Sequence, residues 1–163
     1  LIDTDSMYGV YFNANPNQWF RLITLMFIHI GFGHLTSNMI ILYFVWPQFE
    51  QLIGSVKFLT IYLLSGIVGN VACLLINPET IAAGASTAIF GMFGALLYYG
   101  LISHDQDLRT FGQFYIALII INVIYTFINP SISVPGHIGG LVAGFLVALG
   151  LNTLFKSKDR WRY

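Results

Sequence analysis

The feature that most constrains this chain is a series of long apolar segments separated by short polar joints. Crossing the hydrocarbon core of a bilayer takes about 20 predominantly apolar residues in a helix, and five segments of the sequence qualify. They are residues 26–46, 58–76, 84–103, 112–129 and 136–155. Each is expected to be helical, because lipid offers no hydrogen-bond partner to an open backbone. The sequence therefore predicts an all-α polytopic membrane protein with five transmembrane helices.

Composition and charge support this class and exclude others. Of the 163 residues 56% are hydrophobic and 9% are charged, whereas soluble domains carry about 25% charged residues. The net charge is zero and no basic run occurs before the C-terminus, which argues against a nucleic-acid partner. Cys73 is the single cysteine, so no disulfide can form within the chain. Without repeats or low-complexity segments, residues 1–163 are expected to form one domain.

The joints between the apolar segments contain residues that stop helices. In chain order they read "PQFEQLIGSVK", "NPET", "SHDQDLR" and "NPSISVP". The first 25 residues are less apolar than the spans and include Trp19 and Arg21. We expect residues 1–25 to form an interfacial stretch ahead of the first span.

The basic residues predict the orientation of the chain. If the five spans alternate, residues 1–25 and the joints "NPET" and "NPSISVP" face one side, which holds only Arg21. The other side holds the remaining six of the seven basic residues. Because cytoplasmic loops carry an excess of Lys and Arg, we expect the C-terminus to be cytoplasmic and residues 1–25 to face outward.

Four polar residues are expected to meet in the outer part of the membrane. Polar side chains within spans are costly and often functional. His34 and Asn38 are one helical turn apart near the outer end of the first span, so they share a face. Ser86 begins the third span at its outer end, and His137 begins the fifth.

The four residue types suit acyl transfer. A serine hydroxyl becomes a strong nucleophile when a base accepts its proton, which makes His137 the candidate base for Ser86. His34 and Asn38 can donate hydrogen bonds to a developing oxyanion. Phe90 lies one turn after Ser86 and is placed to stack on the imidazole ring.

Each of these features also has an ordinary structural explanation. A serine at the start of a helix usually caps it, a His/Asn pair often bonds between helices, and Gly140 and Gly144 are spaced for close helix packing. His29 and His104 are expected to be ordinary structural histidines, the first near the interface and the second in a cytoplasmic joint away from the cluster. The occurrence of all four polar residues on one side favours a functional site.

Four segments, in this order, resemble motifs of the rhomboid intramembrane serine proteases: "FRLITLMFIHIGFGHLTSNM", "FEQLIG", "GASTAIFG" and "HIGGLVAG". The resemblance implies that Ser86 is the nucleophile, in a Gly-x-Ser motif that begins at Gly84. It also implies that His137 is the general base, in a His-x-x-Gly-x-x-x-Gly pattern completed by Gly140 and Gly144.

The same resemblance assigns further roles. It implies an oxyanion hole formed by His34, Asn38 and the backbone amide of Ser86. Arg21 matches the second residue of the family's Trp-Arg motif. Glu50 matches a Glu-x-x-x-Gly pattern that ties the second conserved helix of the family to its first loop.

The chain departs from the family pattern in several places. Thr87 follows the serine where glycine is usual, Phe90 replaces a common tyrosine, and Phe20 stands where the Trp-Arg motif has tryptophan. The family core has six spans, of which the first would precede Leu1. Because five spans are counted here and the first residue is not Met, we expect that this first helix is missing from the sequence.

The resemblance implies an intramembrane serine endopeptidase that hydrolyses peptide bonds in or near transmembrane segments of membrane-protein substrates by a Ser–His dyad. The expected partners are those substrates and the lipid bilayer, with no metal, cofactor or nucleic acid. The expected location is the bacterial plasma (inner) membrane, with the active site toward its outer face.

Two other functions remain open from the sequence. One is a non-catalytic rhomboid-like protein that binds membrane clients. The other is a transporter or channel with His34, Asn38 and His137 along a polar path, which is weakened because no charged residue lies in the middle of a span. A zinc protease is disfavoured because no His-Glu-x-x-His pattern occurs.

Overall fold

The computed structural model describes residues 16–78 and 83–155, and every regular element in this part of the chain is helical. This confirms the all-α class. The elements are η1 (Pro16–Gln18), α3 (Arg21–Thr24), η2 (Leu25–Phe27), α4 (Phe32–Ile53), α5 (Ser55–Ile76), α6 (Ser86–Ile102), α7 (Gln106–Phe114), α8 (Ile116–Ile128) and α9 (Val134–Phe155). The part of the expected interfacial stretch that precedes residue 16 lies outside the described residues.

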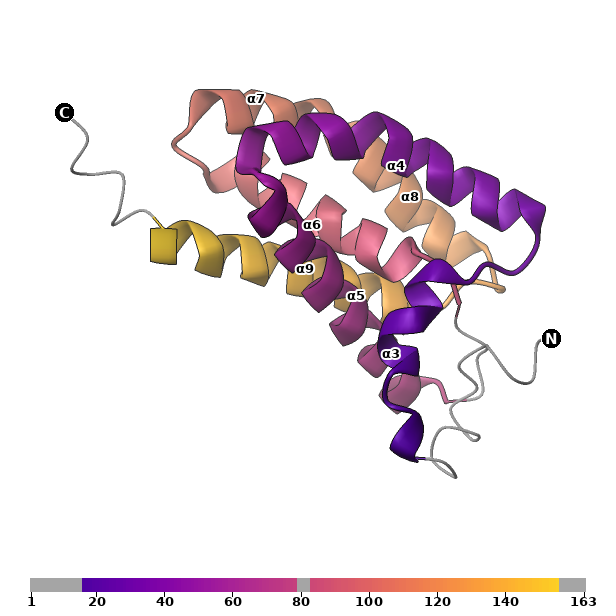
Figure 1. Cartoon of the computed structure of the whole chain (residues 1–163). Helices are drawn as coiled ribbons and strands as arrows, with labels where there is room; N and C mark the ends of the chain where they lie inside the picture. The colour runs from indigo at the N-terminus through magenta and orange to yellow at the C-terminus, as the bar shows by residue number, and fades with distance from the viewer. Residues whose placement is uncertain (1–15, 79–82, 156–163) are drawn as a thin grey trace.

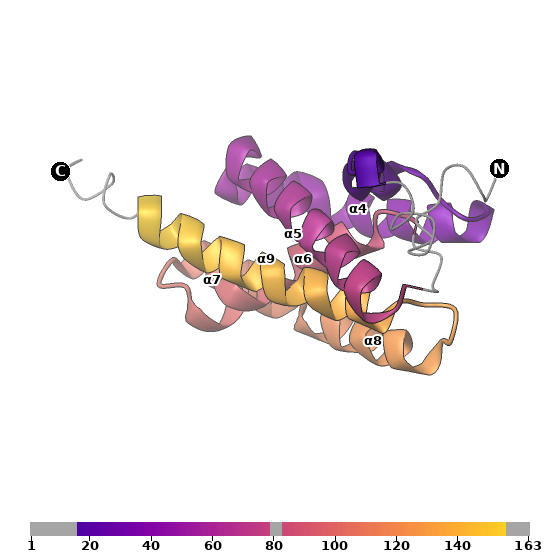
Figure 2. The same ribbon diagram turned by 90° about the horizontal axis from the view of Figure 1, so that it is seen from below.

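Helix α6 forms the centre of the bundle. It packs most extensively against α9 and α5, and nearly all of its side chains are buried. Helices α4 and α8 overlap in the view of Figure 1, and Figure 2 shows that they lie on opposite sides of α6. Both pack on the core less extensively. The helix that carries the candidate nucleophile is therefore surrounded by protein rather than by lipid.

Small residues bring the central helices together. A Cβ atom on Gly140 would collide with the carbonyl oxygen of Thr87, and one on Gly144 would collide with that of Gly91. Helices α6 and α9 therefore approach backbone to backbone, as small residues spaced four apart permit in membranes.

The membrane-spanning capacity differs among the five expected spans. Among the described residues, α5 and α9 are each long and apolar enough to cross a membrane as single helices. The number of possible spans rises to four if each of two bent helix pairs is counted as one span. Helix α6 has 17 residues, or about 25 Å at 1.5 Å per residue, which is less than the hydrocarbon thickness of about 30 Å. The chain is an integral membrane protein whose central helix is short.

The first predicted span has wrong boundaries at both ends. Helix α4 begins at Phe32 rather than 26, because the chain turns by 89° after the short helices that end at Phe27. At its other end α4 continues through Pro47 to Ile53, although the sequence placed a joint there. Phe49 is fully buried, and burial of this continuing apolar face outweighs the helix-breaking tendency of proline. Only Gly54, at φ +84°, separates α4 from α5.

The fourth predicted span is also a bent pair. Helix α7 begins at Gln106 rather than 112, because the carboxylate of Asp105 caps it by accepting hydrogen bonds from the amides of Asp107 and Leu108, both at 3.0 Å. Helix α8 follows after Tyr115 at an angle of 42°. Part of the expected joint "SHDQDLR" is therefore helical.

Candidate active site

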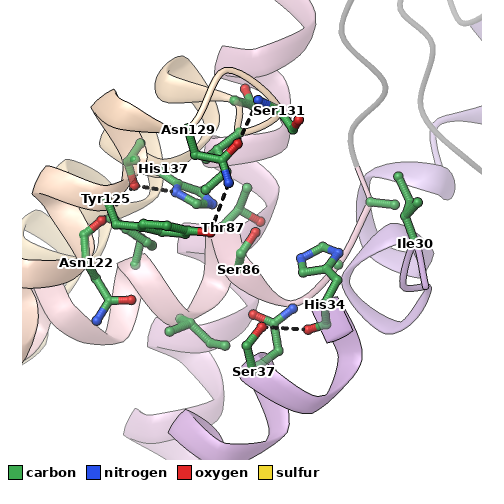
Figure 3. Close-up of a pocket in the computed structure, with 18 of the residues that line it drawn as sticks. Ile30, His34, Ser37, Ser86, Thr87, Asn122, Tyr125, Asn129, Ser131 and His137 are labelled. Atoms are coloured by element: carbon green, nitrogen blue, oxygen red, sulfur yellow. Dashed lines mark hydrogen bonds between the residues drawn. The ribbon is translucent and has the colours of Figure 1, made fainter. Parts of the chain in front are cut away.

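The four polar residues singled out in the sequence line one cavity of about 640 Å³. Ser86 comes from α6, His137 from α9 and His34 from α4 (Figure 3). Asn38 is one turn after His34 on α4. Ser86 lies between His137 and His34 in this view. The structure therefore brings together all four residues of the predicted cluster.

Ser86 is held at the beginning of α6 by the loop that precedes it. Gly84 has φ +111°, a conformation that favours glycine, and its amide donates to the carbonyl oxygen of Leu25 at 2.8 Å. A Cβ atom there would lie 2.5 Å from Cε1 of His34. Both the backbone conformation and the neighbouring imidazole thus require glycine two residues before the serine.

The hydroxyl of Ser86 does not cap the helix. The N-cap residue of α6 is Ala85, and within the described part of the chain no side chain caps this helix. Ser86 is half-buried and borders the cavity. No hydrogen bond between Ser86 and His137 occurs among the described residues; catalytic hydrogen bonds are often long in the absence of substrate.

His137 is buried and fixed by neighbours on two elements. The side chain is 7% exposed, and its ring stacks on Phe90 with a centroid separation of 4.0 Å and an interplanar angle of 20°. Its Nδ1 atom lies 2.9 Å from the hydroxyl oxygen of Thr126. The expected stacking of Phe90 on this imidazole is thus present.

His34 and Asn38 face the start of α6 from α4. Asn38 is 5% exposed, and its amide nitrogen Nδ2 is buried without a hydrogen-bond partner in the described part of the chain. This Nδ2 atom lies 3.4 Å from the Cβ position of Gly84. A buried donor without a partner costs about 1–3 kcal/mol, so its retention beside a cavity calls for a functional explanation.

His29, expected to be a structural residue near the interface, contacts the start of α6 and the ring of His34. It sits in the turn between η2 and α4, where its Nε2 atom accepts a hydrogen bond from the amide of Ala85 at 3.4 Å. Its ring meets that of His34 edge to face at 5.4 Å between centroids. The signal in the sequence is the pair of glycines in "HIGFGH", which interrupts the helical pattern just after this histidine. His104 lies beyond the other end of α6, as expected.

Helix α8 and its C-cap residue Asn129 contribute a polar lining that the sequence analysis missed. Asn122, Tyr125, Thr126 and Asn129 all border the cavity, and the amide of Asn129 donates to the hydroxyl of Tyr125 at 2.9 Å. Their spacing of three and four residues places them on one helix face. That periodicity in an otherwise apolar segment is the signal that would have revealed them.

Thr87, the departure from the family pattern, is held by α5. Its hydroxyl donates to the side-chain oxygen of Asn70 at 3.2 Å, and Asn70 in turn donates to the carbonyl oxygen of Leu22 at 2.8 Å. The additional hydroxyl is therefore bonded to a neighbouring helix and joins α6 to the N-terminal helices through α5.

The remaining supporting residues have different positions. Arg21 begins α3. Glu50 lies twelve residues after Asn38 on α4, about 18 Å along the helix, and accepts a hydrogen bond from the indole of Trp46 at 2.7 Å. Glu50 is thus far from the cavity, and its side chain is bonded to Trp46 in its own helix and to Ser55 at the start of α5. Among the described residues no three His, Cys, Asp or Glu side chains are grouped to hold a metal.

Comparison with known proteins identifies relatives along most of the chain. A family model described as the Rhomboid domain matches residues 16–153. Rhomboid protease GluP of Bacillus subtilis (strain 168) is 45% identical over 148 residues, which cover 87% of this chain and 29% of that protein. Putative rhomboid protease YdcA of the same organism is 34% identical over 88% of this chain and 73% of its own length.

A plant relative is similar at the same level. RHOMBOID-like protein 7 of Arabidopsis thaliana is 35% identical over 91% of this chain and 47% of its own length. The chain thus spans less than half of GluP and of this plant protein. The family match and the shared identity lead to one conclusion. This chain is a member of the rhomboid family.

Proposed function

We propose that this protein is an intramembrane serine endopeptidase that cleaves transmembrane protein substrates with a Ser86–His137 dyad. Membership of the rhomboid family and the names of the relatives, Rhomboid protease GluP and Putative rhomboid protease YdcA, support a peptidase. The assignment of residues rests on the geometry of the cavity.

The observation that carries the proposal is the unpartnered amide of Asn38 in the cavity that also contains Ser86 and His137. A structural asparagine in an apolar bundle satisfies its donors, as Asn70 does. A donor kept free beside the candidate nucleophile is suited to a charge that exists only during reaction.

In the proposed mechanism the Oγ atom of Ser86 attacks the scissile carbonyl carbon while His137 accepts the hydroxyl proton. The resulting oxyanion accepts hydrogen bonds from Asn38, His34 and the amide of Ser86. That amide belongs to the first turn of α6, where backbone N–H groups lack a helical partner. His137 then protonates the leaving amine. In the second half of the reaction His137 accepts a proton from water, which attacks the acyl-enzyme, and then returns the proton to the Oγ atom of Ser86.

The location is part of the proposal. We place the chain in the bacterial plasma membrane with the cavity toward the outer face. Lys57 near the start of α5 and Arg109 in α7 lie toward the end of the bundle opposite Ser86, while Arg21 in α3 lies on the Ser86 side. An excess of basic residues marks the cytoplasmic side. The 17-residue length of α6 supports a nucleophile below the membrane surface that water reaches from outside.

The test is covalent labelling with a fluorophosphonate, followed by mapping of the modified residue and by a cleavage assay on a transmembrane substrate in liposomes. We expect label on Ser86, and loss of labelling and cleavage in Ser86→Ala and His137→Ala by roughly 10⁴-fold or more. Ser131→Ala is the matched control, because Ser131 borders the same cavity and its side chain is exposed.

Cleavage by Ser86→Ala at the wild-type rate would contradict the dyad. A wild-type protein that binds the substrate but neither takes up label nor cleaves would instead point to the client-binding function left open by the sequence.

A further inference from the structure

Thr126 of α8 is the side chain that contacts the imidazole nitrogen of the candidate base. Its Oγ1 atom lies 2.9 Å from Nδ1 of His137, and both side chains are buried, with 1% and 7% exposure. In Figure 3 this hydrogen bond is the dashed line that ends on the His137 ring. A neutral histidine carries one N–H, and the partner of one ring nitrogen decides which nitrogen holds the proton.

The Thr126 hydroxyl has a second partner in the backbone of its own helix, to which it can give its hydrogen. Oγ1 donates to the carbonyl oxygen of Asn122, four residues earlier in α8, at 2.9 Å. A hydroxyl has one hydrogen and two lone pairs. With that hydrogen on the carbonyl, the oxygen of Thr126 is left as an acceptor toward His137, the arrangement in which the ring proton is on Nδ1.

Other threonines show that the bond within α8 is the usual one for this side chain. Thr36 and Thr60 also donate to the carbonyl four residues earlier, at 2.8 and 2.7 Å, a common choice for threonine inside helices. At these two positions no imidazole is bonded to the hydroxyl. What sets Thr126 apart is the second partner on its free lone pair.

We propose that Thr126 is a positioning residue that fixes His137 in the Nδ1–H tautomer and so leaves the Nε2 lone pair to accept the proton of Ser86. This rests on the function proposed above for His137. Phe90 stacks on the face of the same ring. Stacking therefore fixes the orientation of the ring plane, and the hydroxyl of Thr126 fixes the tautomer. Thr126 acts through His137 and does not touch the reacting atoms.

A hydroxyl fits this environment where the carboxylate of a conventional triad would not. A carboxylate buried in an apolar bundle requires several compensating hydrogen bonds. A threonine oxygen can accept from Nδ1–H of both the neutral ring and the imidazolium, so the contact persists through the proton transfer.

The kinetic test compares Thr126→Val with Thr126→Ser in the full chain. Valine keeps the shape and removes the acceptor, so we expect kcat to fall roughly tenfold, the size of one neutral hydrogen bond, with KM unchanged. Serine restores the acceptor and should restore kcat. Thr60→Val is the matched control, because it loses the same intrahelical hydrogen bond on α5 and should leave kcat unchanged.

The second readout is the ¹⁵N spectrum of the imidazole rings, which does not depend on activity. A protonated and an unprotonated ring nitrogen resonate far apart, and a His137→Gln sample identifies the signals of this residue among the four histidines. We expect the proton on Nδ1 in the wild type and in Thr126→Ser, and a mixture of tautomers in Thr126→Val.

A proton on Nε2 in the wild type would overturn the proposal, as would a Thr126→Val protein with unchanged kcat and tautomer. If Thr126→Val does not fold, the wild-type and Thr126→Ser spectra still decide the tautomer. If Ser86→Ala retained cleavage, the dyad would fail while the spectrum still reported whether Thr126 fixes the ring.

Discussion

At the scale of single residues, the two buried asparagines that border the cavity differ in how their side chains are bonded. Asn70 is 2% exposed, donates to Leu22 and accepts from Thr87. Asn38 is 5% exposed and has a buried donor without a partner in the described part of the chain. The first arrangement stabilises the fold, whereas the second costs stability and is suited to binding a transient negative charge.

This difference predicts opposite effects of the same substitution at the two positions. Asn38→Leu removes the unpartnered donor, so we expect the melting temperature to stay the same or rise while kcat falls on the order of 10²–10³. KM should change little, because the oxyanion exists only in the transition state. Thermal unfolding in detergent and turnover in liposomes are measured on the same purified protein.

Asn70→Leu is the matched control for that experiment. It leaves the carbonyl oxygen of Leu22 and the hydroxyl of Thr87 without their partner, and we expect a loss of about 1–3 kcal/mol of stability. A lower melting temperature with normal turnover in Asn38→Leu would show that Asn38 is structural.

At the scale of elements, the position of Ser86 depends on how closely α6 and α9 pack. Gly144 of α9 lies against the backbone of Gly91, and Gly140 lies against that of Thr87. The oxygen atoms that a side chain would meet belong to helix backbones and cannot rotate away. The distance between the helices that carry Ser86 and His137 is therefore set by these glycines.

Gly144→Ala should therefore be costly despite its better helix propensity. We expect a loss of roughly 1–3 kcal/mol from overpacking, seen as a lower melting temperature, together with reduced turnover because His137 shifts relative to Ser86. Gly150→Ala is the control on the same helix, since nothing lies within 4 Å of its added Cβ atom. It should be neutral or stabilising by up to about 1 kcal/mol, and equal melting temperatures for both variants would refute this packing role.

At the scale of the whole molecule, the polar cavity and two of the three described basic residues, Lys57 and Arg109, lie at opposite ends of the bundle. The third, Arg21, begins α3, whose Leu22 is bonded to Asn70 on the cavity side. Ser86 starts α6 near the turn between α8 and α9, while Lys57 and Arg109 are near the ends of α5 and α7 that lie away from it. If the bundle crosses the membrane as proposed, this separation sets which loops face the cytoplasm.

Cysteine accessibility tests that orientation. In a Cys73→Ala background, which removes the single native thiol, Ser131→Cys and Asp105→Cys each place a thiol at an exposed position in one of two opposite loops. In intact cells a membrane-impermeant maleimide should label the first and should label the second only after lysis. The reverse pattern would place the cavity on the cytoplasmic side.

The sequence by itself determined the helical membrane class and the four residues that meet in the cavity. Hydropathy over about 20 residues and the spacing of motifs are local properties of the chain, and alternating spans were enough to gather Ser86, His137, His34 and Asn38 at one end. The same reasoning misplaced the ends of α4, because burial of Phe49 on other helices keeps the chain helical beyond Pro47.

Only the tertiary structure decided how these residues are bonded. The contact of His29 with Ala85 joins residues 56 apart, and that of Thr126 with His137 joins two helices across a turn. Whether Asn38 finds a partner depends on all the elements around it. Such contacts form between side chains from different helices, so no local pattern encodes them, and they become defined only when α4, α6, α8 and α9 pack together.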